Sequence, residues 1–194
     1  KPRVRFSYSA VLHHHSQLAV IGGGPAGLRA AEIAAARGLR VTLYDGKPSV
    51  GRKFLVAGKG GLNLTHGEAF DRFVTRYTGP DPPADVWGKL VAEFDPGALR
   101  DWAAGLGVET FQATSGRVYP RALKAAPLLR RWIERLRNLE VHFEMKHRLV
   151  SLDPGQPYRL GFANDTAATA DAVILALGGG SWAKTGSDGA WTAI

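Results

Sequence analysis

A short glycine-rich segment is the part of the sequence whose residue types and spacing point most directly to chemistry. It fits the pattern G-x-G-x-x-G, and its residues are Gly22, Gly23, Gly24, Pro25, Ala26 and Gly27. In such a segment Gly22 allows a tight turn, Gly24 lets a pyrophosphate approach the backbone, and Gly27 lets a helix pack closely on a strand. The free N–H groups and the positive end of the following helix would face the phosphates. The segment therefore predicts a binding site for a dinucleotide.

An acidic residue lies at the distance that this kind of site requires. Asp45 follows the second apolar run after the glycines, where a carboxylate can accept hydrogen bonds from ribose hydroxyls. Pro25 suits the first turn of a helix, because its missing N–H would be unpaired there anyway. A glycine-rich turn in another kind of α/β protein is the alternative, and it does not account for Asp45.

The elements that would position these residues form one β-α-β unit. We expect a strand over Leu18–Ile21, a helix from Pro25 to about Arg37 that Gly38 ends, and a buried strand over Leu39–Tyr44. The unit predicts an α/β, Rossmann-like dinucleotide-binding domain with a parallel sheet and helices on both faces.

A third apolar strand is expected over 172–177, of the type buried in parallel sheets, and it leads into Gly178 and Gly179. Ligands of open α/β sheets lie at the carboxyl ends of the strands, so the backbone here is expected to pass beside the dinucleotide.

A long glycine-rich segment, 46–66, forms the second candidate region. Long loops in compact domains are usually functional or disordered, and glycines permit close approach of a ligand. Lys53 and Lys59 can neutralise phosphate charge, and Asn63 can donate or accept a hydrogen bond at a ring edge. We expect a loop that covers a cofactor, and a solvated mobile loop is the alternative.

Three motifs carry a resemblance to a known family: Ile21 to Gly27, Gly51-Arg52-Lys53-Phe54, and Gly58 to Thr65. Together they resemble bacterial NAD(P)/FAD-dependent oxidoreductases, the HI0933-like or aminoacetone oxidase-like flavoproteins. Many flavoproteins share the first motif, and the other two are far more restricted. The resemblance covers the chain from about Gln17 onward.

The resemblance implies FAD as the cofactor, with the flavin carrying redox chemistry on an unidentified small molecule, and it leaves NAD(P)H open as an electron donor. It assigns no catalytic acid or base. Asp188 is either a flavin-side ligand or a turn residue. The residues assigned to the cofactor are Gly22, Gly24, Pro25, Ala26, Gly27, Asp45, Arg52, Lys53, Lys59, Gly60, Gly61, Asn63, Ala176, Gly178 and Gly179.

The middle of the chain predicts further elements. Helices are expected over 69–77, 84–94, 96–105 and 126–138, with Asp95 capping the third, and a strand over 108–112. Strands over 140–145, 147–152 and 158–163 are expected to form an antiparallel meander inserted before the last parallel strand.

Residues 1–17, with histidines at 13–15, are expected to be a flexible leader, and residues 18–194 to form the FAD/NAD(P)-binding domain. Members of the resembled family are longer. The sequence is therefore expected to be an N-terminal fragment that lacks an inserted domain and a returning C-terminal segment.

Composition limits the classes of function. With 194 residues, 45% of them hydrophobic, the chain fits a globular protein rather than a disordered one. The absence of cysteine excludes disulfides, thiolate zinc sites and dithiol redox pairs. We expect a cytoplasmic protein that does not enter a membrane.

The net charge of +8 makes nucleic acid a conceivable partner, although no recognition motif accompanies it. The alternatives to a flavoprotein are a nicotinamide-dependent dehydrogenase and a non-catalytic nucleotide- or RNA-binding module.

Overall fold

A computed structural model describes residues 16–57, 60–78, 84–179, 189 and 191. The chain divides into two compact units, and each is described by itself. Unit 1 combines the residues up to Val50 with those from Leu136 onward, and unit 2 is Gly51–Arg135. The predictions made for residues 1–15, for Lys59 and for Asp188 lie outside the described residues.

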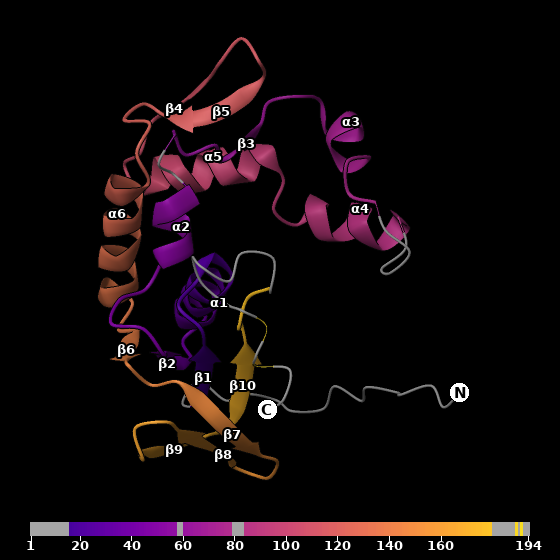
Figure 1. Ribbon diagram of the computed structural model, residues 1–194. Helices are drawn as coiled ribbons and strands as arrows, with labels where there is room; N and C mark the ends of the chain where they lie inside the picture. The colour runs from indigo at the N-terminus through magenta and orange to yellow at the C-terminus, as the bar shows by residue number, and fades with distance from the viewer. Residues whose placement is uncertain (1–15, 58–59, 79–83, 180–188, 190, 192–194) are drawn as a thin grey trace. The chain divides into compact units, whose positions relative to one another are not determined.

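A four-stranded parallel sheet forms the centre of unit 1 (Figure 1). Its strands, in spatial order, are β10 (Ala172–Leu175), β1 (Gln17–Ile21), β2 (Arg40–Asp45) and β6 (His142–Met145). Ile21 pairs with both Tyr44 and Leu175, and Asp45 pairs with Met145, so all four strands end at the same edge. The expected α/β fold with a parallel sheet is confirmed.

Helix α1 (Pro25–Ala36) covers one face of this sheet. Its buried positions Leu28, Ala31 and Ala34 recur at intervals of three residues, which keeps them on one side of the helix. The strands beneath are apolar on both faces, and Val20 and Leu43 are completely buried. Burial of each such side chain stabilises the fold by about 2 kcal/mol, so this packing holds α1 against the sheet.

An antiparallel sheet packs against residues of the other face. Its strands are β7 (Leu149–Asp153), β8 (Tyr158–Phe162) and β9 (Ala167–Ala170). Alternate residues Ala19 and Ile21 of β1 share a core with Leu160 and Phe162 of β8. Tyr44 of β2 stacks on Phe162 with 4.7 Å between ring centroids.

The expected antiparallel meander exists, but the prediction assigned one wrong strand to it. The first predicted member, 140–145, is strand β6, which pairs parallel to β2, and the third true member, β9, was missed. Val141 N–H donates to the Leu136 carbonyl, and Glu140 has φ 59°, so the chain turns directly from the preceding helix into β6. A strand that follows a helix can return parallel to its neighbour, and its short sequence does not show which sheet it joins.

The last apolar run is shorter and more exposed than expected. Strand β10 ends at Leu175, and Ile174 and Leu175 are 37% and 53% exposed. The reason is its place at the edge of the four-stranded sheet, where β1 is its one partner among the described strands.

Unit 2 contains a small antiparallel sheet and short helices. The sheet has the order β3 (Thr65–His66), β5 (Arg117–Pro120), β4 (Thr110–Gln112). The helices are α2 (Arg52–Ala57), α3 (Phe70–Val74), α4 (Ala84–Ala92), α5 (Pro96–Gly105) and α6 (Ala125–Asn138), which continues into unit 1.

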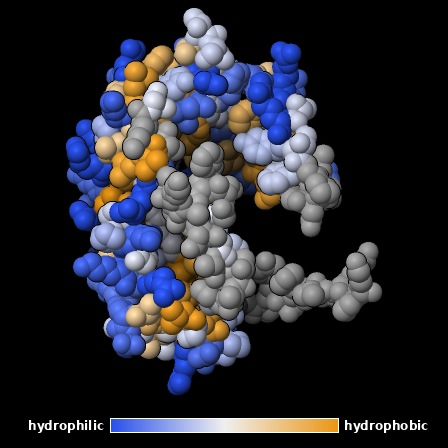
Figure 2. Space-filling model, in the orientation of Figure 1, coloured by the Kyte–Doolittle hydropathy of each residue, from blue (hydrophilic) through white to orange (hydrophobic). Residues whose placement is uncertain are grey.

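The predicted cap of α5 and the predicted helix over 126–138 are both confirmed. The Asp95 carboxylate accepts a hydrogen bond of 2.7 Å from the Ala98 N–H, as expected of a capping residue. Helix α6 buries Leu128, Leu129 and Trp132, while Arg130 and Arg131 are exposed, and hydrophilic residues predominate over α6 in Figure 2. No helix in the described part of the chain is long and apolar enough to cross a membrane.

Candidate nucleotide-binding site

The carboxyl ends of the four parallel strands bring most of the predicted site residues of unit 1 to one edge. Strand β1 leads into Gly22, β2 ends at Asp45, β6 ends at Met145, and β10 leads into Ala176. In open α/β sheets ligands bind at this edge.

The turn between β1 and α1 is shaped by glycines. Gly22 has φ +109°, a conformation that strains any other residue, and its N–H donates to the Tyr44 carbonyl at 2.8 Å. A Cβ at Gly22 would lie 2.9 Å from the carbonyl carbon of Ala176. A Cβ at Gly27 would collide with the Gly22 carbonyl. The structure therefore agrees with the turn and packing roles expected of Gly22 and Gly27, and it places Ala176 against the turn, where its N–H donates to the Ile21 carbonyl at 2.8 Å.

Gly24 differs from its neighbours because it borders open space. A Cβ built on it meets no atom of the described residues within 4 Å. Gly24 is also the N-cap of α1, and no side chain caps the helix. The first helical hydrogen bond runs from Leu28 N–H to the Gly24 carbonyl, so the N–H groups of Ala26 and Gly27 have no partner within the helix. Together these groups can bind an anion.

Asp45 is half-buried and is held by two backbone donors. Its Oδ2 accepts from the Gly23 N–H and its Oδ1 from the Lys47 N–H, both at 2.7 Å. A carboxylate offers about four acceptor positions, so each oxygen keeps capacity for a ribose hydroxyl.

Gly23 is a site residue that the sequence analysis did not select. The G-x-G-x-x-G motif allows any residue at this position. The sequence nevertheless has a glycine there, and that choice was the one indication that residue 23 has a role. A Cβ there would lie 2.5 Å from Val50 Cγ1 and 2.9 Å from Asp45 Oδ2.

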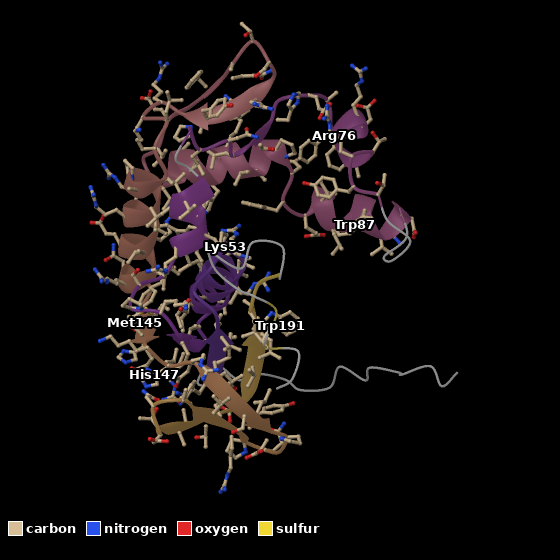
Figure 3. All side chains as sticks on the ribbon, viewed as in Figure 1. Lys53, Arg76, Trp87, Met145, His147 and Trp191 are labelled. Carbon is tan, nitrogen blue, oxygen red and sulfur yellow. The ribbon has the colours of Figure 1, made fainter. Side chains whose placement is uncertain are left out.

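The loop that carries Asp45 is braced from β6. His147 N–H donates to the Asp45 carbonyl at 2.9 Å, and Lys146 N–H donates to the Lys47 carbonyl at 3.1 Å. The His147 ring, which lies just beyond Met145 in Figure 3, meets the Tyr44 ring edge-on at 5.9 Å. Burial, and then the nearby charge of Glu144, raise the pKa of Tyr44, so this phenol stays neutral.

Most of the remaining predicted residues belong to unit 2. Arg52 is exposed and Lys53 half-buried on α2, where Figure 3 labels Lys53. Gly60 and Asn63 are exposed, and Gly61 is half-buried beside the Tyr119 ring. Their role at a cofactor stays a prediction, as it does for Gly178 and Gly179, which are exposed after β10.

Part of the second glycine-rich segment is anchored to the sheet of unit 2. Leu62 N–H donates to the Leu123 carbonyl at 2.9 Å, and Leu64 N–H donates to the Val118 carbonyl at 2.8 Å. Leu62 is also buried. These contacts argue against a mobile loop over residues 62–64.

A polar cluster in unit 2 was not expected from the sequence. Arg76 donates to Glu68 Oε2 at 2.8 Å, and His66 Nδ1 lies 3.4 Å from Glu68 Oε1. The hydrogen bond from Arg76 is the main cause that holds the pKa of Glu68 below its usual value. His66 Nε2 also lies 3.1 Å from the Ser115 carbonyl, so the cluster ties β3 to the turn between β4 and β5.

The parallel sheet, the uncapped start of α1 and the carboxylate at the end of β2 define a Rossmann domain. Within that class, the chain belongs to the family described as the HI0933-like protein Rossmann domain, whose model matches residues 16–194.

Solved structures share this fold at low sequence identity. A 3-ketosteroid-Δ4-(5α)-dehydrogenase from Rhodococcus jostii RHA1 matches with a TM-score of 0.62 and 16% identity, over 87% of this chain and 47% of that one. A flavocytochrome c3 fumarate reductase gives a TM-score of 0.63 and 18% identity, over 85% and 34%. THI4 of Thermovibrio ammonificans gives 0.51 and 17%, over 89% and 62%. The chain spans less than two thirds of the length of each, and at these identities the likeness is one of fold.

Proposed function

We propose that this chain is the dinucleotide-binding part of an FAD-dependent oxidoreductase that acts on a small molecule. The observation that carries the proposal is the meeting, at one sheet edge, of an uncapped helix start beside open space at Gly24 and the carboxylate of Asp45. Membership of the HI0933-like Rossmann family supports the proposal of a nucleotide ligand. The solved structures with a similar fold include a dehydrogenase and a flavocytochrome reductase.

The residues present fit FAD. The N–H groups of Ala26 and Gly27 would bind the pyrophosphate at the open side of Gly24, and Asp45 would accept hydrogen bonds from the adenosine ribose. Ala176 would bring the backbone after β10 beside the pyrophosphate. The flavin supplies the redox chemistry when it is bound. Lys53 and the segment from Gly60 to Asn63 are proposed to contribute charge and hydrogen bonds to the phosphates and the flavin edge.

The first test is a visible absorption spectrum of the purified protein after addition of FAD and removal of free cofactor. We expect a retained flavin spectrum. Titration with NAD then separates the two cofactors, and titration with ADP, the part that FAD and NAD share, tests the nucleotide site itself. Binding of NAD with no retention of FAD would contradict the flavoprotein proposal in favour of a nicotinamide-dependent enzyme. Binding of neither FAD nor ADP would contradict the nucleotide site itself.

The substitution Gly24→Val tests the pyrophosphate position. A valine would occupy the open space beside the helix start, so FAD and ADP binding should be lost. Because Gly24 has φ −78° and its Cβ would meet no atom, the cost to folding should be about 1 kcal/mol or less. Calorimetric titration and urea denaturation measure the two effects. Normal ADP affinity in this variant would rule out the assignment of Gly24.

A further inference from the structure

The end of β2 and the β1–α1 turn are joined by a contact that the proposed function does not require. Asp45 Oδ2 accepts the Gly23 N–H at 2.7 Å, although the two residues are 22 positions apart. Asp45 Oδ1 accepts the Lys47 N–H at the same distance, so the side chain is held from both sides. We propose that Gly23 and Asp45 form a latch that holds the glycine-rich turn in its ligand-binding conformation before a ligand arrives. Asp45 is then a positioning residue as well as the proposed ribose ligand.

The latch explains why residue 23 is a glycine. The fingerprint leaves this position open to any side chain. Here a Cβ would lie 2.5 Å from Val50 Cγ1 and 2.9 Å from Asp45 Oδ2, closer than real Cβ atoms come. A larger residue would force the turn away from Asp45 and break the hydrogen bond.

The latch acts where the turn has little other support. Gly22 is fixed by its hydrogen bond to the Tyr44 carbonyl, and Leu28 closes the first turn of α1 on the Gly24 carbonyl. Between them, Gly24 lacks a side-chain cap and borders open space. The Gly23 hydrogen bond has a charged acceptor, and such bonds are roughly twice as strong as neutral ones. A turn that is already in place costs less to order when a phosphate binds.

The choice of ligand can separate the two proposed roles of Asp45, as a ribose ligand and as a residue that positions the glycine-rich turn. A ribose ligand matters only for a nucleotide that has ribose hydroxyls, whereas a latch matters for every ligand that uses the turn. This inference rests on the proposed nucleotide site, and the test compares ADP with 2′,3′-dideoxyadenosine 5′-diphosphate, which lacks both hydroxyls.

The full chain and the variant Asp45→Ala would be titrated with both nucleotides by calorimetry. We expect Asp45→Ala to weaken both by on the order of tenfold, because each loses the charge-assisted bond that positions the turn. Gly23→Ala, which leaves the carboxylate in place, should also weaken both. If Asp45→Ala weakens ADP alone, the latch is overturned and Asp45 is only a ribose ligand.

Amide hydrogen exchange without nucleotide tests the latch independently of the proposed function. The Gly23 amide should be protected in the wild-type chain, and its exchange should accelerate on the order of tenfold in Asp45→Ala, while the Val20 amide of β1 stays protected. Fast Gly23 exchange in the wild type would overturn the latch. If the wild type binds neither nucleotide, the proposed site fails while this measurement still decides the latch.

Asp171→Ala is a matched control, because Asp171 Oδ2 accepts the Gln17 N–H at 2.8 Å at the opposite end of β1. It removes the same kind of bond and should change neither nucleotide affinity nor Gly23 exchange. Should Asp45→Ala fail to fold, Asp45→Asn replaces it. An asparagine keeps one acceptor oxygen, so exchange should accelerate at Gly23 or at Lys47, and unchanged exchange at both would overturn the latch.

Discussion

Gly60 in the second glycine-rich segment differs from most glycines of the first segment in what requires a glycine at its position. In the first, Gly22, Gly23 and Gly27 are demanded by the protein itself, because a Cβ at any of them would collide with backbone or a packed side chain. In the second segment, a Cβ at Gly46 would lie 2.9 Å from Arg148 Cβ, one at Gly51 would lie 2.5 Å from Leu129 Cδ2, and Gly61 has φ +114°. Among the described glycines of this segment, Gly60 has neither constraint, because a Cβ there meets no described atom within 4 Å. The first segment is therefore determined by packing, with Gly24 as its one open position. Any need for glycine at residue 60 must come from a ligand or from another part of the protein.

The largest effect that can test this contrast is expected for Gly22→Ala. The new Cβ would meet the Ala176 carbonyl, and φ +109° is strained for alanine, so the free energy of unfolding should fall by about 3 kcal/mol. Urea denaturation measures the change. Gly88→Ala in α4 is a control, since its Cβ would lie 3.9 Å from Val74 and alanine favours a helix interior by roughly 0.5–1 kcal/mol. Equal stability of Gly22→Ala and the wild type would refute the packing argument.

A smaller effect on folding stability is expected at alkaline pH, and it comes from Tyr44 in the core beneath the first segment. The pKa of Tyr44 is raised above its ordinary value of 10.0, mainly by burial. Above pH 10.0 the unfolded chain therefore loses this proton more readily than the folded one, and stability should fall as the pH rises. Denaturation at a series of alkaline pH values measures the slope, and Tyr44→Phe, which keeps the ring beside Phe162, should reduce it. An unchanged slope in Tyr44→Phe would show that Tyr44 is not responsible.

Unit 2 should respond at the acid end of the pH scale instead. The pKa of Glu68 is lowered, chiefly by the hydrogen bond from Arg76. Its contribution to stability should be complete above the ordinary pKa of 4.5 and should disappear as the pH falls through the lowered value. In Glu68→Gln this acid-dependent part should be absent, as measured by denaturation between neutral and acid pH. If the two proteins lose stability in parallel, the ion pair with Arg76 contributes nothing measurable.

The smallest effect on stability is expected for Gly60→Ala in the second segment. Because its Cβ would meet no atom, the free energy of unfolding should stay within about 0.5 kcal/mol of the wild type. FAD affinity, measured by titration, should nevertheless fall if this segment covers the cofactor. Unchanged FAD affinity would remove Gly60 from the proposed site and leave its glycine unexplained.

How far the sequence could predict the fold varied with the range of the interactions involved. The cap of α5 by Asp95 depends on residues three positions apart, and the β-α-β unit lies within one continuous stretch from Gln17 to Asp45; both were predicted. The assignment of β6 to the meander failed, because pairing with β2 joins residues that are about a hundred positions apart, such as Thr42 and His142. The exposure of β10 was unexpected for the same reason, since its edge position depends on which strands pair with it.

The candidate site shows the same division. The residue types and spacing of Gly22, Gly24, Gly27 and Asp45 were sufficient to predict a dinucleotide site, because the tight turn and the helix start are local geometry. Only the tertiary structure brought the Gly23 N–H within 2.7 Å of Asp45 and placed Val50 where a side chain at residue 23 would collide. Periodicity and spacing specify elements and their termini, whereas contacts between distant segments depend on how whole sheets assemble. The role of Gly23 belongs to that second kind of information, and the fingerprint could not contain it.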